Sequence, residues 1–189
     1  MKTLYTSAGL GSLILAGTAY GSYTISAETY ADSAYGTTIR LYANMGAGER
    51  LDAVFGSADN EFVIGTTGTF YQNAFGGNMS TNINPLLLGA FPSLEYDTWV
   101  TIGLTDMDGG NVLAQQGMDF SNFGSAVSTS NGSYYVTPDD AQGAEIDGRV
   151  LIGQFTIAGG GSIDDMYGNV NMQGKEADGS TTWQVLDQW

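Results

Sequence analysis

Residues 37–45 of the chain are TTIRLYANM, and this stretch decides the fold class. In an extended chain the side chains alternate, so that Ile39 and Leu41 point to one face and Arg40 and Tyr42 to the other. Such alternation among β-branched and aromatic residues is typical of a strand that buries one face and leaves the other in water. The stretch therefore predicts a half-buried strand of an antiparallel sheet.

The same pattern recurs over most of the chain. Strands are predicted at 22–31, 37–45, 50–56, 60–66, 98–105, 133–137, 149–158, 168–174 and 181–186, with a further one near 112–116. The connectors are rich in Gly, Asn, Asp and Ser, so the 28 glycines are interpreted mainly as turn residues. Short strands at roughly 8–12-residue spacing, without an alternating helical pattern, predict an all-β fold. The specific prediction is an antiparallel β-sandwich, jelly-roll-like, of about 9–10 strands.

The longest connection, residues 67–97, contains FYQNAFGG and INPLLLGAFP. These segments carry too many aromatic and aliphatic side chains for a slack linker, so we expect one long ordered loop that packs against the sheets. Short helical turns are expected near 83–88 and 119–123. Trp99 follows in an apolar stretch and is expected in the core.

The composition excludes most familiar enzyme chemistry. The 189 residues include no His and no Cys, so an imidazole base, a thiolate nucleophile and a zinc site of the usual kind are absent. Twenty acidic residues against five basic ones give a net charge of -15, which repels the phosphate backbone of nucleic acids. We therefore expect neither an enzyme nor a nucleic-acid partner.

Residues 1–21 form an apolar N-terminal segment, with a basic residue near its start, an apolar stretch at 10–16 and small residues at Ala19 and Gly21. This layout predicts a secretory signal peptide. The alternative is that the segment is retained as an arm that packs on a neighbouring copy. Residues 22–189 are predicted to form a single β-sandwich domain. No stretch of the mature chain reaches the ~18 apolar residues that a membrane span needs.

A series of longer segments lies within residues 23–185. In order, they are TTIRLYANM, RLDAVFG, FYQNAFGGN, INPLLLGAFPSLEYDTWVTIG, PDDAQGAEIDGRVLIGQFT and VNMQGKEADGSTTW. Together they resemble an exported β-rich domain of marine and environmental bacteria, often found in surface proteins with a PEP-CTERM sorting signal. The resemblance implies a secreted or surface domain without an assigned activity, and it assigns no site residues. The chain ends at DQW, without the Pro-Glu-Pro motif and tail of that signal, so we expect a soluble or assembling product.

Acidic loops are the candidate metal sites, because Ca²⁺ prefers several oxygen ligands on a tight turn. The first loop holds Asp106, Asp108 and Asn111, and the second holds Asp139 and Asp140. The alternative for the first loop is a plain hairpin turn, since Asn111 stands where an EF-hand requires glycine. Ca²⁺ is thus the one candidate cofactor.

Exposed aromatic side chains are the candidate sugar contacts, and Tyr71, Tyr135 and Trp183 are the residues predicted for this role. The alternative is that these rings pack in the core. Glu95 and Asp97 form an acid pair of the kind that glycoside hydrolases use. At the entrance of a strand, however, they are interpreted as solvated or turn-capping groups.

The few basic residues are interpreted as partners of nearby acids rather than as a binding patch. Arg50 lies two residues before Asp52, and Arg149 lies two residues after Asp147. Local ion pairs are therefore expected at both places.

These expectations converge on a non-catalytic extracellular structural or surface-assembly protein, a subunit of a filament, a shell, a virion or a cell surface. Its copies would form a homo-oligomer or polymer through β-edges or the N-terminal arm. The alternative is a carbohydrate-binding or calcium-dependent adhesion module on a cell surface, with a polysaccharide as partner. Both hypotheses place the protein outside the cell, secreted or surface-associated.

Overall fold

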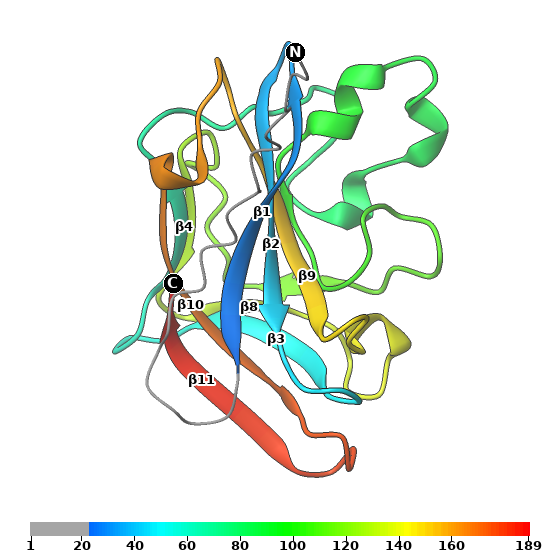
Figure 1. The fold of residues 1–189 in the computed structure, drawn as a ribbon, viewed down its shortest axis with the longest axis vertical. Helices are drawn as coiled ribbons and strands as arrows, with labels where there is room; N and C mark the ends of the chain where they lie inside the picture. Colours follow the sequence, from blue (N-terminus) through cyan, green and yellow to red (C-terminus); the bar gives the residue numbers. More distant parts are fainter. Residues whose placement is uncertain (1–22) are drawn as a thin grey trace, which may run out of the picture.

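Residues 23–189, the part of the chain that this computed structural model describes, form two antiparallel sheets packed face to face (Figure 1). The strands in this range are β1 (Thr24–Ser33), β2 (Gly36–Asn44), β3 (Arg50–Gly56), β4 (Phe62–Thr66), β5 (Trp99–Val100), β6 (Ala114–Gln116), β7 (Ala126–Thr129), β8 (Gly132–Tyr135), β9 (Arg149–Ile157), β10 (Met166–Lys175) and β11 (Thr182–Gln188). Short 3-10 helices are η1 (Ser80–Asn82), η2 (Pro85–Leu87), η3 (Pro92–Tyr96), η4 (Ala141–Gly143) and η5 (Ile163–Asp165). The predicted antiparallel β-sandwich is confirmed. The N-terminal segment 1–21 lies outside the described residues.

The first sheet has the strand order β1-β2-β9-β5. The predicted alternation of β2 is confirmed, because Ile39 and Leu41 are fully buried whereas Arg40 and Tyr42 on the opposite face are partly exposed. The strand β9 differs from β2, since every one of its residues after Arg149 is buried. Both faces of β9 are therefore covered.

In the second sheet, three strands pair with β10: β11 on one side, and both β3 and β4 on the other. Residues 171–175 of β10 pair with β3 and residues 166–169 pair with β4, both antiparallel. The strands β8 and β7 pair in turn with β3 and β4, and only Ser130 and Asn131 join them. Three peptide steps reach at most ~11 Å, whereas neighbouring strands are ~4.8 Å apart. The link is therefore too short to pass across β3, β10 and β4. It follows that β7 and β8 lie end to end in one row of the sheet, and that β3 and β4 lie end to end in the next row, beside β10.

The break between β3 and β4 is a loop that bulges from their common row. Reciprocal backbone hydrogen bonds between Ser57 and Asn60, of 2.9 and 3.2 Å, close this loop. The buried Asn171 of β10 stabilises the break: its Nδ2 donates to the backbone oxygens of Phe55 (3.0 Å) and Asn60 (2.9 Å). Its Oδ1 accepts from the N–H of Asp187 in β11 at 3.0 Å. One amide side chain thus joins three strands.

Apolar side chains from both sheets meet in one core between them. A second apolar cluster lies on the outer side of β9, where Leu151 packs with Ile83, Leu94 and Trp99. The long connection 67–97, green in Figure 1, therefore packs as a cover over β9. Its expected packing and the burial of Trp99 are both confirmed.

One strand prediction is wrong in extent, and one strand of the structure was not predicted. The predicted strand 98–105 reduces to the two residues of β5. Gly103 adopts a positive φ of 78°, and the N–H of Leu104 turns back to the oxygen of Ile102 at 3.0 Å, so the chain leaves the sheet there. The strand β7 is absent from the predicted set, because turn-forming residues surround its four residues.

The interpretation of the glycines as turn residues is wrong for some that lie in strands. A Cβ atom on Gly56 in β3 would lie 1.9 Å from the carbonyl oxygen of Thr129 in β7. A Cβ atom on Gly174 in β10 would lie 1.9 Å from the carbonyl oxygen of Arg50 in β3. These two glycines allow a close backbone approach between strands.

Among residues 23–189, no helix has both the length and the apolar character that crossing a bilayer requires.

Replacing Gly56 by alanine should lower the free energy of unfolding by about 1–3 kcal/mol, the usual cost of overpacking. Gly124→Ala is the matched control, because a Cβ atom at Gly124 would meet no atom within 4 Å. The control should leave stability unchanged or raise it by about 0.4–1 kcal/mol. Urea unfolding of both variants measures the difference, and equal stabilities would contradict the packing argument.

Candidate binding face

The outer face of the first sheet carries the polar and aromatic side chains that the alternation of β2 turns away from the core. Arg40 and Tyr42 come from β2, Tyr30 from the edge strand β1, and Arg149 and Gln154 from β9. The strand register places Gln154 directly opposite Arg40. We call these residues the arginine–tyrosine face.

Each guanidinium group of this face lies over a tyrosine ring. The Cζ atom of Arg40 is 3.6 Å from the ring centroid of Tyr30. The Cζ atom of Arg149 is 4.0 Å from the ring centroid of Tyr42. Cation–π contacts of this kind hold the flat groups in defined positions and leave part of each surface open to solvent.

Gln154 positions Arg40 from within the sheet. Its fully buried side chain accepts a hydrogen bond from Nε of Arg40 at 3.0 Å. Its Nε2 donates to the backbone oxygens of Glu95 and Asp97, each at 2.9 Å. Within the described residues, no carboxylate lies at ion-pair distance from Arg40, and its terminal amino groups make no hydrogen bond to the protein. The guanidinium therefore keeps free donors on an open surface.

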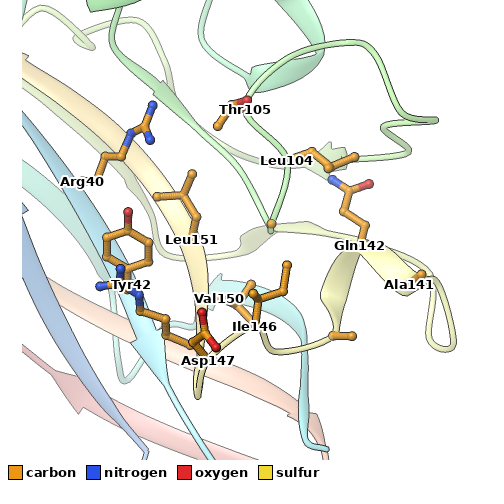
Figure 2. Close-up of a pocket in the computed structure, with 13 residues that line it drawn as sticks. Arg40, Tyr42, Leu104, Thr105, Ala141, Gln142, Ile146, Asp147, Val150 and Leu151 are labelled. Carbon is orange, nitrogen blue, oxygen red and sulfur yellow. The ribbon is translucent and has the colours of Figure 1, made fainter. Parts of the chain in front are cut away.

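Two adjoining hollows share Arg40 and Thr105 in their walls. The larger has a volume of about 320 Å³, with Arg40 and Tyr42 on one side and Leu104 and Gln142 on the other (Figure 2). The smaller has a volume of about 180 Å³ and extends to Tyr30. Together they form an open groove over β2 and β9.

Further tyrosines continue this face beyond Tyr30. The hydroxyl of Tyr30 donates to Oε1 of Glu95 at 3.2 Å. The ring of Tyr96, the next residue in the chain, stacks on Tyr35 with centroids 5.8 Å apart. The rings of Tyr35 and Tyr71 are 4.9 Å apart. Tyr71, one of the predicted sugar contacts, therefore belongs to a row of tyrosines that the sequence did not reveal.

The other two predicted sugar contacts lie on the second sheet. Trp183 in β11 is only 7% exposed, and its ring stacks on Tyr23 with centroids 4.0 Å apart, so its expected exposure is wrong. The missing side chain of its strand partner Gly174 makes room for the indole ring. Tyr135 in β8 is half-buried, next to the fully buried Tyr134. The structure does not bring the three predicted aromatics together.

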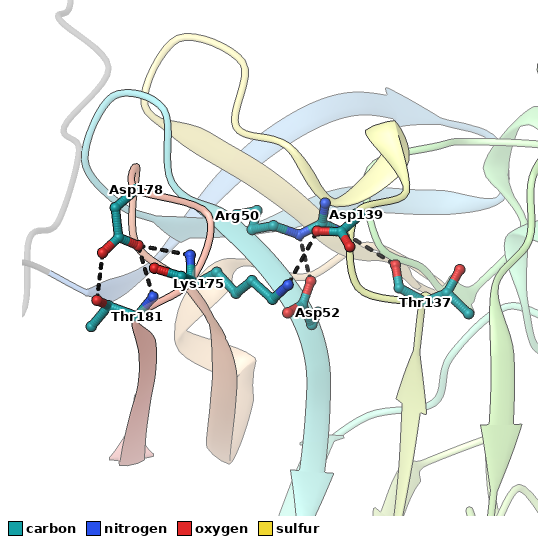
Figure 3. A network of polar contacts seen from close by, with 8 residues as sticks. Arg50, Asp52, Thr137, Asp139, Lys175, Asp178 and Thr181 are labelled. Atoms are coloured by element: carbon teal, nitrogen blue, oxygen red, sulfur yellow. Dashed lines mark hydrogen bonds and ion pairs between the residues drawn. The ribbon is translucent and has the colours of Figure 1, made fainter.

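The ion pairs agree with the sequence at one place and differ at another. Nε of Arg50 contacts Oδ1 of Asp52 at 2.5 Å, as expected (Figure 3). Arg149, however, donates from Nη1 to Oε2 of Glu28 at 2.8 Å, so the expected pair with Asp147 is wrong. The partner comes from an adjacent part of the first sheet that the sequence spacing does not indicate.

The first acidic loop uses its oxygen atoms within the chain. Oδ1 of Asp106 accepts from the N–H of Asp108 at 2.9 Å. Oδ1 of Asn111 accepts from the N–H of Leu113 at 3.1 Å and from Nε2 of Gln142 at 2.8 Å. The loop thus has the hydrogen bonds of a turn, but the expected hairpin is wrong, because β5 and β6 belong to different sheets.

In the second acidic loop, Asp139 and Asp140 serve different contacts. Oδ1 of Asp139 accepts from Nζ of Lys175 at 3.1 Å (Figure 3). Oδ1 of Asp140 accepts from the N–H of Gln142 at 2.9 Å and caps η4. Between residues 23 and 189, no group of three or more acidic side chains gathers in a way that would hold a metal ion. Calcium binding at either loop stays a prediction.

Asp97 is a fully buried carboxylate beneath the long connection. It accepts hydrogen bonds from the backbone N–H groups of Asn73 at 2.6 Å and Gly77 at 3.0 Å. The predicted capping role is therefore confirmed, whereas the predicted solvation of Asp97 is wrong. Burial raises the pKa of Asp97 to about 6, although the two N–H groups favour the ionised form.

Comparisons of the chain with protein-family models, with curated proteins and with solved structures find no match. The interpretation of the binding face therefore depends on its own residues.

The raised pKa of Asp97 should make stability depend on pH. Its pKa in the folded protein, about 6, exceeds the ordinary value of 3.8, so the folded chain binds the proton more tightly. The stabilisation is fully present below the ordinary pKa and is lost as the pH rises towards 6, with a slope of up to about 1.4 kcal/mol per pH unit. Asp97→Asn should remove this part of the slope. Urea unfolding of both proteins between pH 4 and 7 measures it, and parallel profiles would contradict the assignment.

Proposed function

We propose that the protein is a non-catalytic extracellular structural or surface-assembly protein whose copies associate through the edge strand β1. The observation that carries the proposal is the length and accessibility of this edge. β1 has ten residues and pairs along one side with β2. Among residues 23–189, no backbone hydrogen bond reaches its other side.

An open strand edge presents a row of N–H and C=O groups that another strand can pair with. Part of the inner face of β1 is also open to solvent. Ile25, Ala27 and Thr29 share its inner face, and they change from buried to half-buried to exposed along the strand. At the opposite edge of the same sheet, β5 has only two residues. The strand β1 is therefore the better template.

The chemistry of the chain supports an assembling role outside the cell. The net charge of -15 gives an acidic shell that suits a salty exterior, and the resemblance to exported surface domains points to the same location. The apolar stretch 10–16 precedes β1 in the chain by only a few residues. A retained N-terminal arm is therefore a second candidate for the contact between copies.

Thr29→Lys should abolish assembly without unfolding the subunit. A lysine on the inner face of an edge strand is a charge that a paired strand would have to bury. Thr182→Lys in β11 is the matched control, since Thr182 is also an exposed threonine near an edge. Electron microscopy and sedimentation velocity of the full chain should show filaments or oligomers for the wild type and the control, and monomers for Thr29→Lys.

Two results would contradict the proposal. One is a wild-type protein that stays monomeric at high concentration and lies in the soluble fraction of its native source. The other is equal loss of assembly in both lysine variants. The intact mass of the native protein adds a separate answer, because a chain that begins near Ser22 excludes the N-terminal arm and leaves the β1 edge as the contact.

A further inference from the structure

We propose that the arginine–tyrosine face binds a chain of neutral sugars, a polysaccharide that lies along β2 and β9. This site is separate from the backbone edge of β1, and the proposal does not depend on assembly. Its basis is the combination of the Arg40 guanidinium, which pairs with no acid among residues 23–189, a row of partly exposed tyrosines and two adjoining hollows.

The hydrogen-bonding groups of the groove match hydroxyl groups. A sugar hydroxyl both donates and accepts, so its site needs both kinds of partner. Arg40 supplies free donors on a planar fork, which can contact two neighbouring hydroxyls at once. Carboxylates that line the hollows supply acceptors, namely those of Glu95 and Asp147. Gln154 and the stack on Tyr30 hold the Arg40 fork in place before any ligand arrives.

The tyrosine rings provide flat apolar surfaces against which the C–H groups of a sugar ring can pack. Tyr30 is 43% exposed and Tyr35 is 39% exposed, so both residues are partly open to solvent. Contacts to Arg40 and Tyr71 restrict their motion, which lowers the entropy lost on binding. Leu104 and Leu151 add apolar surface inside the larger hollow.

The shape favours a chain over a small molecule. Small ligands are usually enclosed in a cavity that buries most of their surface. Here the two hollows are open and meet at Arg40. From Tyr42 to the beginning of β2 the strand covers ~20 Å, and the tyrosines run along this length to Tyr35 and Tyr71. Several sugar units can lie in such a groove one after another.

Charge decides between neutral and anionic polymers. Two guanidinium groups face the groove, those of Arg40 and Arg149. The carboxylates around them outnumber these cations, and they are Glu28, Glu95, Asp106 and Asp147. Because the whole chain also carries a net charge of -15, a polymer of uronates or sulfated sugars would be repelled. A neutral polysaccharide meets no such penalty.

The test uses the full-length protein and a fixed panel of polymers. The neutral probes are cellulose, chitin, xylan and a β-1,3-glucan, and alginate is the anionic probe. Pull-down on the insoluble polymers and native affinity electrophoresis in gels with the soluble ones measure retention. The wild type should be retained by at least one neutral polymer and should not be retained by alginate.

Variants then locate the binding site. Tyr30→Ala and Arg40→Ala should each weaken binding about tenfold, which corresponds to about 1.4 kcal/mol. Arg40→Lys should weaken it as well, because an ammonium group lacks the planar fork. Tyr167→Ala is the matched aromatic control, since Tyr167 in β10 is 48% exposed on the other sheet. Lys175→Ala is the matched cation control. The Tm of each variant separates loss of binding from loss of folding.

Three results would overturn the proposal. The first is a wild type that no neutral polymer retains. The second is retention by alginate alone, which would show that the ligand is anionic. The third is an equal loss of affinity in Tyr30→Ala and Tyr167→Ala, both folded, which would place any binding away from this face. None of these results bears on assembly through β1.

Discussion

The burial of β9 on both faces is the constraint on which the rest of the structure depends. One face of this strand belongs to the core between the sheets, and the other would be exposed apolar surface without the long connection. Ile83 and Leu94 of this connection, together with Trp99 of β5, pack on Leu151. Burying the polar backbone of such a loop requires hydrogen-bond partners, which the buried side chains of Gln154 and Asp97 provide.

Gln154 also links the cover to the outer surface of the sheet. The same amide that accepts from Arg40 donates to the backbone of the cover. The position of Arg40 therefore depends on the packing over β9, and the cover itself lines the smaller hollow through Ile83, Leu94 and Glu95. The free donors of Arg40 stand out in a chain with so many carboxylates. Outside this face, the other described cations, Arg50 and Lys175, both contact acids.

The sequence predicted those features that depend on neighbours along the chain. Alternation in β2 correctly placed Ile39 and Leu41 in the core, and the apolar content of residues 67–97 correctly predicted packing. Prediction from the sequence failed where segments that are distant along the chain meet. Trp183 is buried because Gly174 stands opposite it in another strand, and Arg149 pairs with Glu28 rather than with Asp147. Of the predicted sugar contacts, Tyr71 alone joins the tyrosine row.

By itself, the sequence determined the all-β class, the outward direction of Arg40 and Tyr42, and the lack of histidine and cysteine chemistry. These follow from local periodicity and composition, which need no knowledge of strand pairing. Only the tertiary structure decided which side chains share a surface. Tyr30, Glu95 and Gln154 come together because β1 and β9 pair on either side of β2 and the cover over β9 brings η3 onto this sheet. Register is set by the burial of whole faces, a property of the assembled sheets that no single segment contains.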